Sequence, residues 1–426
     1  MTRLQDIAAQ LSGYDPSALS VAKAQEFIAR LVPRVTAVES LPLRSALGRV
    51  LARDIVSPIN VPASDNSAMD GYALRSSELR ASGPSDFGVA GTSFAGEAFD
   101  GVAAPGQCVR IMTGAVMPDR FDTVVPQEFV QLTADGTVTV PAGVVRSGDN
   151  RRLAGEDLRL GEPALQAGRV LRPADLGLMA SLGRAEVPVF RRLRVAFFST
   201  GDELRSVGEA LDEGCVYDSN RYTLWGMLQR LGVELIDMGV VPDEPEALEA
   251  TFRAAAENAD AVITSGGVSV GEADHTKQVM ARIGDVLFWK IAMRPGRPMA
   301  IGRIESNGRQ AILFGLPGNP VAVMVTFYAF VRDALLAMSG AASCPLPMLR
   351  AATTEAIRKK AGRTEYQRGI VSRAADGSLQ VAITGSQGSG ILRSMSVANG
   401  LVVLHHEQGD VEAGGWVDVL PFDGLV

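Results

Sequence analysis

Cysteine and long apolar runs are both scarce in this sequence. The three cysteines, Cys108, Cys215 and Cys344, lie far apart, which excludes a disulfide framework and the paired spacing of a zinc site. The first residues contain no apolar segment typical of a secretory signal, and nowhere do about 18 uncharged apolar residues follow one another, as a membrane span requires. We therefore expect a soluble protein in a reducing compartment, the cytoplasm.

An excess of positive charge is also lacking. The chain has 41 Lys and Arg against 48 Asp and Glu, which gives a net charge of −7. Because nucleic-acid binding depends on a positive field that neutralises phosphates, the composition argues against a nucleic-acid partner. An anionic ligand would have to meet a local cluster of basic residues instead.

The composition is that of a globular protein, with 46% hydrophobic and 21% charged residues among 426. Its length predicts roughly three domains at about 100 to 200 residues each. Changes of pattern along the chain predict an elongated multidomain protein of α/β plus β class, with these units: a helical and extended N-terminal domain (1–55 with 146–190), an inserted small β-rich domain (56–145), an α/β domain (191–340) and a C-terminal β domain (345–426).

The N-terminal unit carries both helical and extended patterns. Residues 20–52 predict two amphipathic helices around an extended link, with Ser20 and Ser45 as N-caps. Residues 146–190 predict a helix over 173–182, and we expect this segment to pack beside the first helices. The β-rich residues between them would then be an insertion.

From residue 193 onward, apolar strands alternate with helices. The pattern predicts helices over 221–231, 245–258 and 276–283, then a strand hairpin, then a long apolar helix over 320–339. This alternation predicts a parallel sheet. The short strands after residue 345, separated by Gly and Asp turns, predict a small β-barrel or sandwich.

Two loops that follow strands have unusual compositions, and ligands of open α/β sheets bind at such loops. In STGDEL, Gly201 permits a tight turn while Thr200, Asp202 and Glu203 present oxygen atoms, although an ordinary capped helix start would look similar. In SGGVSVGEADHTK, three glycines leave backbone amides open to a phosphate, and Asp274 adds a carboxylate that a Mg²⁺ ion could bridge to it. The alternative for the second loop is a merely flexible glycine segment.

A third loop is basic. KIAMRPGRP contains Lys290, Arg294 and Arg297, and after a hairpin LPGNPV begins a helix at Pro320 with Asn319 as its expected cap. Arginine forks suit two-point contact with oxyanions, and a helix N-terminus also favours an anion. The alternative is a solvated basic surface.

Eight separated segments occur in one order along the chain: DNSAMDGYA from Asp65, VRIMTGAVMP from Val109, GED from Gly155, STGDEL, VYDSNR from Val216, GGVSVGEADHTK, KIAMRPGRP and LPGNPV. Together they resemble the molybdopterin molybdenumtransferase family, to which the C-terminal domain of gephyrin is related. The resemblance covers nearly the whole chain.

The resemblance implies a reaction in which adenylyl-molybdopterin and molybdate give molybdenum cofactor and AMP, with a divalent cation, usually Mg²⁺. It also implies an elongated homodimer whose site lies between the α/β domain of one subunit and the small β domain of the other. On the family's pattern the catalytic residues are Asp65, Thr113, Glu203, Asp243, Asp274, Lys290 and Arg294, with Glu203, Asp243 and Asp274 as our hypothetical magnesium ligands. Further binding positions implied by the resemblance are Asp157, Arg368 and Ser389.

The loops themselves add other candidate binding residues: Thr200, Gly201, Asp202, Ser265, Gly266, Gly267, Ser269, Gly271, Arg297, Pro317, Gly318 and Asn319. In our hypothesis the basic residues hold molybdate and phosphate oxygens, while Asp65 and Thr113 reach the site across the dimer interface. The alternative for Asp65 and Thr113 is a purely structural role in a turn at the end of a strand. Many relatives carry Lys where this chain has Arg294 and Arg297, so its oxyanion geometry differs from theirs.

Three alternatives stay open at this point. A molybdopterin adenylyltransferase shares the α/β fold but needs neither β domain. A gephyrin-like scaffold would bind protein segments between the same domains. A tungsten-inserting relative would look the same, because tungstate and molybdate have nearly the same size and charge; a separate adenylyltransferase and molybdoenzymes are possible partners.

Overall fold

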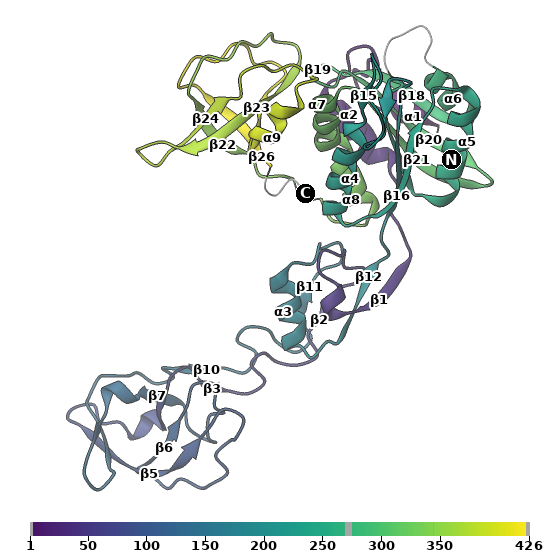
Figure 1. The fold of residues 1–426 in the computed structure, drawn as a ribbon. Coiled ribbons are helices and arrows are strands. Elements are labelled where there is room, and N and C mark those ends of the chain that lie inside the picture. Colours follow the sequence, from purple (N-terminus) through teal and green to yellow (C-terminus); the bar gives the residue numbers. More distant parts are fainter. Residues whose placement is uncertain (1–2, 269–274, 344, 423–426) are drawn as a thin grey trace.

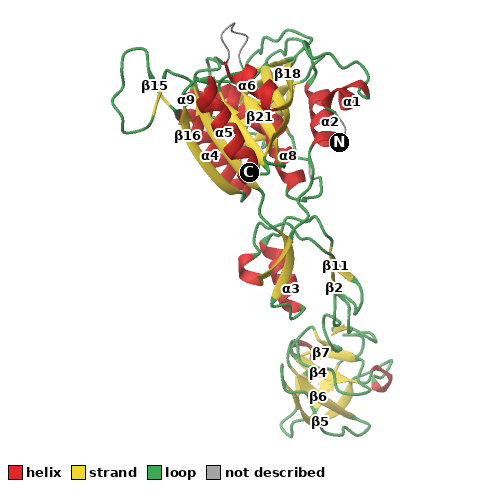
Figure 2. Ribbon diagram, turned by 90° about the vertical axis from the view of Figure 1, so that its right-hand side faces the viewer, coloured by secondary structure: helices red, strands yellow, loops and turns green. Residues whose placement is uncertain are grey.

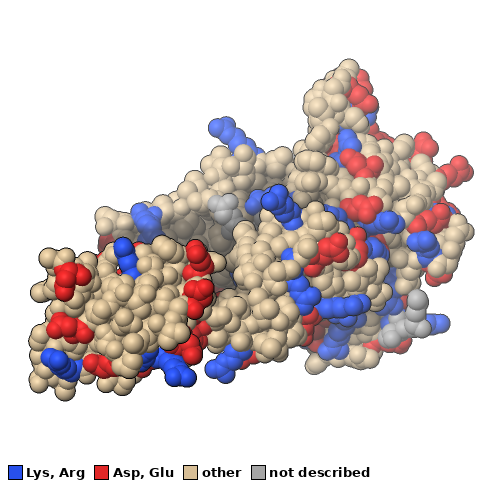
Figure 3. Space-filling model, turned by 90° about the horizontal axis from the view of Figure 1, so that it is seen from below, with Lys and Arg blue, Asp and Glu red and all other residues tan. Residues whose placement is uncertain are grey.

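The computed structural model describes residues 3–268, 275–343 and 345–422. The molecule is elongated (Figures 1 and 2), with a small β domain at one end and the α/β body with the C-terminal β domain at the other. Acidic and basic side chains are interspersed over the face shown in Figure 3, in keeping with the absence of an overall positive charge. The mixed α/β and β fold that we expected is confirmed.

The α/β body is built on one six-stranded sheet, in the order β16-β13-β17-β21-β20-β18. Its strands are β13 (Arg194–Thr200), β16 (Glu234–Val241), β17 (Ala261–Ser265), β18 (Gly284–Lys290), β20 (Pro298–Ser306) and β21 (Arg309–Leu316). The first four in spatial order are parallel, and β20 runs antiparallel to both of its neighbours. The predicted parallel sheet is therefore present, extended at one side by the hairpin.

Helices cover both faces of this sheet. Along β13, Val195 and Phe197 face one core while Ala196 and Phe198 face the other, which is why four consecutive residues of the strand are apolar. The helices are α4 (Ser219–Leu231), α5 (Pro245–Asn258), α6 (His275–Ile283), α7 (Pro320–Thr326) and α8 (Arg332–Met338), with a π-helical turn over Phe327–Val331. Helices α4, α7 and α8 share the core of Val195, and α5 and α6 share that of Ala196, so the predicted helices are confirmed.

The helical stretch Pro320–Met338 is the one helix in the described ranges that is long and apolar enough to cross a membrane, with a mean hydropathy of 1.7. It is 72% buried inside the protein. Its apolar side chains pack in the main core beneath the sheet, as expected of the central helix of a domain.

The first helices, α1 (Leu4–Ala9) and α2 (Val21–Leu31), belong to the α/β body. The Ser20 hydroxyl caps α2 by accepting from the Lys23 amide at 3.4 Å, as predicted. Phe27 packs edge-on against Trp289 of β18, with ring centroids 5.0 Å apart. We had expected these helices beside residues 146–190, but their apolar face is instead buried in the core of the sheet.

The second helix predicted before residue 52 is wrong. Residues Val38–Pro42 form strand β1, followed by a 3-10 turn over Leu43–Ser45, so Ser45 lies inside a turn and caps no helix. Strand β1 pairs antiparallel with β12 (Glu186–Phe190) along its whole length. The expected extended link is therefore present. After Ser45, in place of the expected helix, Val50 and Leu51 form isolated bridges to Val170 and Val189, and this long-range pairing overrides the local helical pattern.

The ladder continues outward from β1 and β12 as a narrow connection (Figure 2). Its strands are β2 (Ile55–Val56) paired with β11 (Pro163–Leu165), and β3 (Asn66–Ser67) paired with β10 (Arg151–Arg152). Helix α3 (Pro173–Ser181) packs on it over a separate small core. Segment 146–190 therefore packs on residues 38–67 and not on the first helices.

Both β domains have their own cores. The small domain has the sheet order β7-β4-β6-β5-β9-β8, from β4 (Gly71–Leu74), β5 (Ser85–Ser93), β6 (Gln107–Ile111), β7 (Thr123–Pro126), β8 (Gln131–Leu132) and β9 (Val138–Val140), with 3-10 turns at Ser76–Glu78 and Gln127–Phe129. The C-terminal domain contains β22 (Leu349–Thr353), β23 (Thr364–Arg373), β24 (Leu379–Ile383), β25 (Gly400–Leu404), β26 (Trp416–Pro421) and α9 (Leu392–Val397). It closes into a barrel because β23 pairs with both β24 and β25.

Two short pairs complete the fold. Strands β14 (Leu204–Arg205) and β15 (Val216–Tyr217) form an arm after β13. Strand β19 (Met293–Arg294) pairs parallel with β23, and so connects the α/β body to the barrel.

Candidate active site

The loops after β13, β17 and β21 meet at the carboxyl edge of the sheet. Helices α4 and α6, which follow the adjacent strands β13 and β17, lie on opposite faces, so a crevice opens between these loops. The Gly266 amide donates to the Leu316 carbonyl at 3.1 Å, and a Cβ on Gly266 would lie 2.4 Å from the Thr200 carbonyl oxygen. Likewise, a Cβ on Gly267 would lie 2.4 Å from the Thr276 hydroxyl.

These contacts correct one expectation. We predicted that the glycines of this loop leave their amides open to a phosphate, but the amide of Gly266 is already paired. The glycine is required because the loops approach one another so closely. Ser269, Gly271 and Asp274 lie outside the described residues.

A pocket of about 490 Å³ opens where the α/β body meets the barrel. Its lining includes six predicted site residues: Arg294, Arg297, Pro317, Gly318, Asn319 and Ser389. Sequence positions separated by almost the length of a domain thus lie around one cavity. The barrel side is tied to the α/β side because the Val321 amide donates to the Ser389 carbonyl at 3.0 Å.

The predicted capping role of Asn319 is not found. Asn319 is the residue that precedes α7, but its side chain makes no capping hydrogen bond. Pro320 has no N–H to offer, and the Val321 amide is satisfied by Ser389. Donors at this end of the helix are therefore fewer than the sequence suggested.

Arg363 and Gln387 also line the pocket, and the sequence reasoning missed both. The Arg363 guanidinium pairs with Glu365, which is almost fully buried, at 2.6 Å. A signal was present in the segment GRTEYQRG, where one arginine precedes β23 and another lies within it, but only Arg368 was selected.

Arg368 lies behind the pocket wall. It is fully buried and donates to the backbone carbonyls of Ser386 (3.3 Å), Gln387 (3.3 Å) and Gly388 (2.9 Å). Burial, with a smaller effect of Arg294, lowers the pKa of Arg368 to about 10, so the guanidinium stays charged at neutral pH. Arg368 therefore shapes the loop that leads to Ser389, and its charge adds to the positive potential behind the pocket.

Acidic groups gather at the other side of the crevice. The Asp243 amide donates to the Asp202 carboxylate at 3.2 Å, and the Thr276 hydroxyl donates to the Asp243 carboxylate at 3.2 Å. The Glu203 carboxylate folds over Gly201, where a Cβ would lie 2.6 Å from its Oε2. Within the described ranges, no group of three or more His, Cys, Asp and Glu is placed to hold a metal ion.

Lys290 is exposed at the end of β18, opposite Pro298 of β20, which itself lines the pocket. Its side chain does not line the pocket. The structure therefore places Lys290 beside the basic loop and outside the cavity.

The remaining predicted residues, Asp65, Thr113 and Asp157, belong to the small β domain and its connection, at the far end of the molecule (Figure 1). Both the amide and the hydroxyl of Thr113 donate to Asp70 at 2.7 Å. These bonds, chiefly that of the hydroxyl, hold the pKa of Asp70 below its usual value. Asp70 is the second aspartate of DNSAMDGYA and was missed, since the sequence does not show which aspartate meets Thr113.

Asp65 makes its own local contacts. Its carboxylate accepts from the Ala154 amide at 2.7 Å and pairs with Arg151 at 3.4 Å. Asp157 is exposed nearby, with its amide donating to the Val61 carbonyl. One chain does not bring these residues to the pocket.

Comparison with known proteins agrees with this arrangement. Residues 19–183 match the MoeA N-terminal region (domain I and II), 196–337 match the probable molybdopterin binding domain, and 350–422 match the MoeA C-terminal region (domain IV). Molybdopterin molybdenumtransferase of Haemophilus influenzae is 44% identical over 409 residues, which are 96% of this chain and all of that protein. The chain belongs to the molybdopterin molybdenumtransferase family.

Other family members support the same assignment. The molybdopterin molybdenumtransferase of Nostoc sp. is 35% identical, over 94% of this chain and 93% of its own length. A molybdopterin biosynthesis moeA protein from Pyrococcus horikoshii OT3 has the same fold, with a TM-score of 0.82 at 27% identity, covering 95% of this chain and all of that one. The family that we expected from the eight motifs is confirmed.

Proposed function

We propose that this chain inserts molybdate into adenylyl-molybdopterin and releases AMP, which completes the molybdenum cofactor. The observation that carries this proposal is the pocket lined by Arg294, Arg297 and Arg363, between the molybdopterin-binding α/β body and the barrel. Molybdate is a doubly negative tetrahedral oxyanion, and a chain with a net charge of −7 can bind it only where cations are concentrated.

The residues of the pocket act by positioning and by charge. Arg294 and Arg297 can each offer two parallel N–H donors to oxyanion oxygens. Pro295 and Pro317 restrict the backbone of the two loops that carry these groups, so the donors are held in place before the ligand binds. The pterin phosphates would lie along the crevice beside Gly267.

We further propose that Glu203, Asp243 and Asp274 hold Mg²⁺. Carboxylate oxygens are the ligands this ion prefers, and Asp243 is already oriented by Thr276. The described residues supply two of the three carboxylates. When bound, the ion would neutralise charge on the phosphates of the substrate, and Glu203 and Asp243 are the described residues that would hold it.

We also propose that the site is completed by a homodimer, because the small β domain and its connection, which carry Thr113 and Asp65, lie at the opposite end of the chain from the pocket (Figure 1). At a molybdate concentration where Arg294→Ala and Thr113→Ala are each nearly inactive, mixing the two proteins with subunit exchange should restore about one quarter of wild-type activity. Half of the dimers would be mixed, and each mixed dimer would contain one intact site. Lack of recovery, with mixed dimers present, would contradict a shared site.

The function is tested by anaerobic incubation of the purified protein with adenylyl-molybdopterin, Mg²⁺ and either molybdate or tungstate. We expect AMP release and reconstitution of an apo-molybdoenzyme with molybdate. Binding without AMP release, under conditions where a known family enzyme turns over, would favour the scaffold alternative. In a parallel incubation with molybdopterin, ATP and Mg²⁺, synthesis of the adenylylated pterin would favour the adenylyltransferase alternative.

The cytoplasm remains our proposal for the location. We also propose the four predicted domains as functional units. The small β domain, its connection and the barrel each have a core of their own, which supports this division. The α/β unit, to which α1 and α2 are assigned, has a core on each face of its sheet, and one of these cores also includes barrel residues such as Tyr366 and Leu401.

A further inference from the structure

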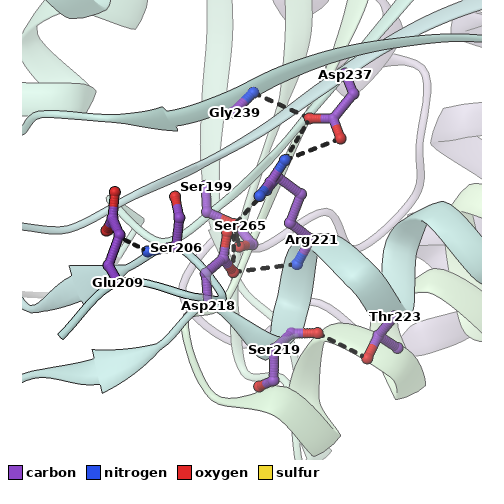
Figure 4. Close-up of polar contacts among 10 residues, drawn as sticks. All are labelled: Ser199, Ser206, Glu209, Asp218, Ser219, Arg221, Thr223, Asp237, Gly239 and Ser265. Carbon is purple, nitrogen blue, oxygen red and sulfur yellow. Dashed lines mark hydrogen bonds and ion pairs between the residues drawn. The ribbon is translucent and has the colours of Figure 1, made fainter. Parts of the chain in front are cut away.

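A buried polar network lies behind the pocket, at the ends of β13 and β17 and the start of α4 (Figure 4). Asp218, only 1% exposed, accepts from the Ser199 hydroxyl at 2.9 Å and from the backbone amide and Nε of Arg221 at 3.1 and 3.3 Å. Arg221 also pairs with Asp237 of β16 at 3.0 Å. The network therefore connects β13, β16 and the first turn of α4.

The direction of its hydrogen bonds is determined by proton counting. Ser199 has one hydroxyl proton and donates it to the carboxylate of Asp218. The 3.0 Å contact between Ser199 and Ser265 must then be donated by Ser265. Each hydroxyl of the network therefore donates to one defined acceptor, and these bonds hold the start of α4 against the ends of β13 and β17.

Asn220 stands in this first turn of α4, two residues after Asp218, and is only 7% exposed. Its Nδ2 donates to the Gly318 carbonyl at 2.7 Å, while its buried Oδ1 has no partner among the described residues. An unpaired buried acceptor costs free energy, which an apolar side chain of similar shape would avoid. What asparagine provides here, and an apolar side chain would not, is the Nδ2 donor to the Gly318 carbonyl.

Gly318 belongs to the loop that lines the pocket. The two cis peptides in the described part of the chain are elsewhere, so the Gly318–Asn319 peptide is trans. In a trans peptide the C=O and the N–H point in opposite directions. With its carbonyl turned inward to Asn220, this peptide directs the Asn319 amide away from Asn220, toward the side where Gly318 and Asn319 line the cavity.

We propose that Asn220 is a positioning residue, which holds the Gly318–Asn319 peptide so that the Asn319 amide faces the pocket as a donor to the bound oxyanion. The reverse orientation would present the Gly318 carbonyl, which repels an anion. This inference rests on the proposed function, because molybdate is taken as the oxyanion.

The test compares Asn220→Asp with Asn220→Ala in the full-length protein. Aspartate has the same shape but replaces the donor with a carboxylate, which repels the Gly318 carbonyl and reverses the peptide. We expect the KM for molybdate to rise about 10- to 100-fold in Asn220→Asp, and less in Asn220→Ala, while kcat changes little. Direct titration with molybdate alone should show the same order of affinities.

Asn258→Asp is the matched control, because it also loses an amide-to-carbonyl bond, to Ala254 at 2.8 Å, at the end of α5. It should behave as wild type. If Asn220 had a merely structural role, the larger truncation, Asn220→Ala, would raise the KM for molybdate more than Asn220→Asp does. That result would overturn the proposal, and so would an unchanged KM in Asn220→Asp. If the wild type itself neither binds nor uses molybdate, it is the proposed function that fails.

A crystal structure of Asn220→Asp provides a second, independent readout. The proposal requires that the Gly318 carbonyl no longer point to residue 220. An unchanged peptide in that structure would refute it.

Discussion

Arg294→Ala should lower the apparent affinity for molybdate by about 10- to 100-fold, the range expected when a charge-assisted contact to the oxyanion is lost at a pocket that is open to solvent. Arg294 lines the pocket on β19, the strand that connects the α/β body to the barrel. A water molecule in place of the guanidinium could not offer the same pair of parallel N–H donors to the oxyanion. The measurement is AMP release as a function of molybdate concentration.

Two variants make this result specific. Arg294→Lys keeps the charge but loses the two-point donor, so an intermediate affinity is expected. Arg309→Ala removes an exposed arginine at the opposite end of β21 and should leave the affinity unchanged. If Arg294→Ala matched Arg309→Ala, the pocket would not be the oxyanion site.

Gly266→Ala should both destabilise the protein and abolish turnover. The added Cβ would lie 2.4 Å from the Thr200 carbonyl oxygen, so the loops after β13 and β17 must separate. Overpacking of this kind costs about 1 to 3 kcal/mol, and the left-handed backbone at φ +93° adds about 1 kcal/mol. The checks are the temperature of thermal unfolding and AMP release.

Gly208→Ala separates the two contributions to this effect. Gly208 has nearly the same backbone angle, φ +97°, but nothing lies within 4 Å of an added Cβ. It should show the backbone cost alone and retain turnover. Equal losses in the two variants would mean that close packing of the loops is not what the site requires.

Elements with a strong local pattern were predicted well. Helix α5 spans Pro245–Asn258 as expected, because its proline start and apolar face are both local signals. The helix predicted after Ser45 is wrong, because Val50 and Leu51 pair instead with Val170 and Val189, more than a hundred residues away. The capping role predicted for Asn319 is wrong for a similar reason. The Val321 amide, which a capping side chain would bind, donates instead to the Ser389 carbonyl of the barrel.

The sequence by itself determined the family, the alternation of strands and helices, and the composition of the loops at the sheet edge, since each of these is encoded within a few neighbouring residues. Only the tertiary structure decided which side chains share the pocket. In GRTEYQRG, Arg363 lines the cavity and Arg368 is buried behind it. The segment has no clear alternation of polar and apolar residues, so the face each arginine occupies follows from the pairing of β23 with its neighbours in the closed barrel.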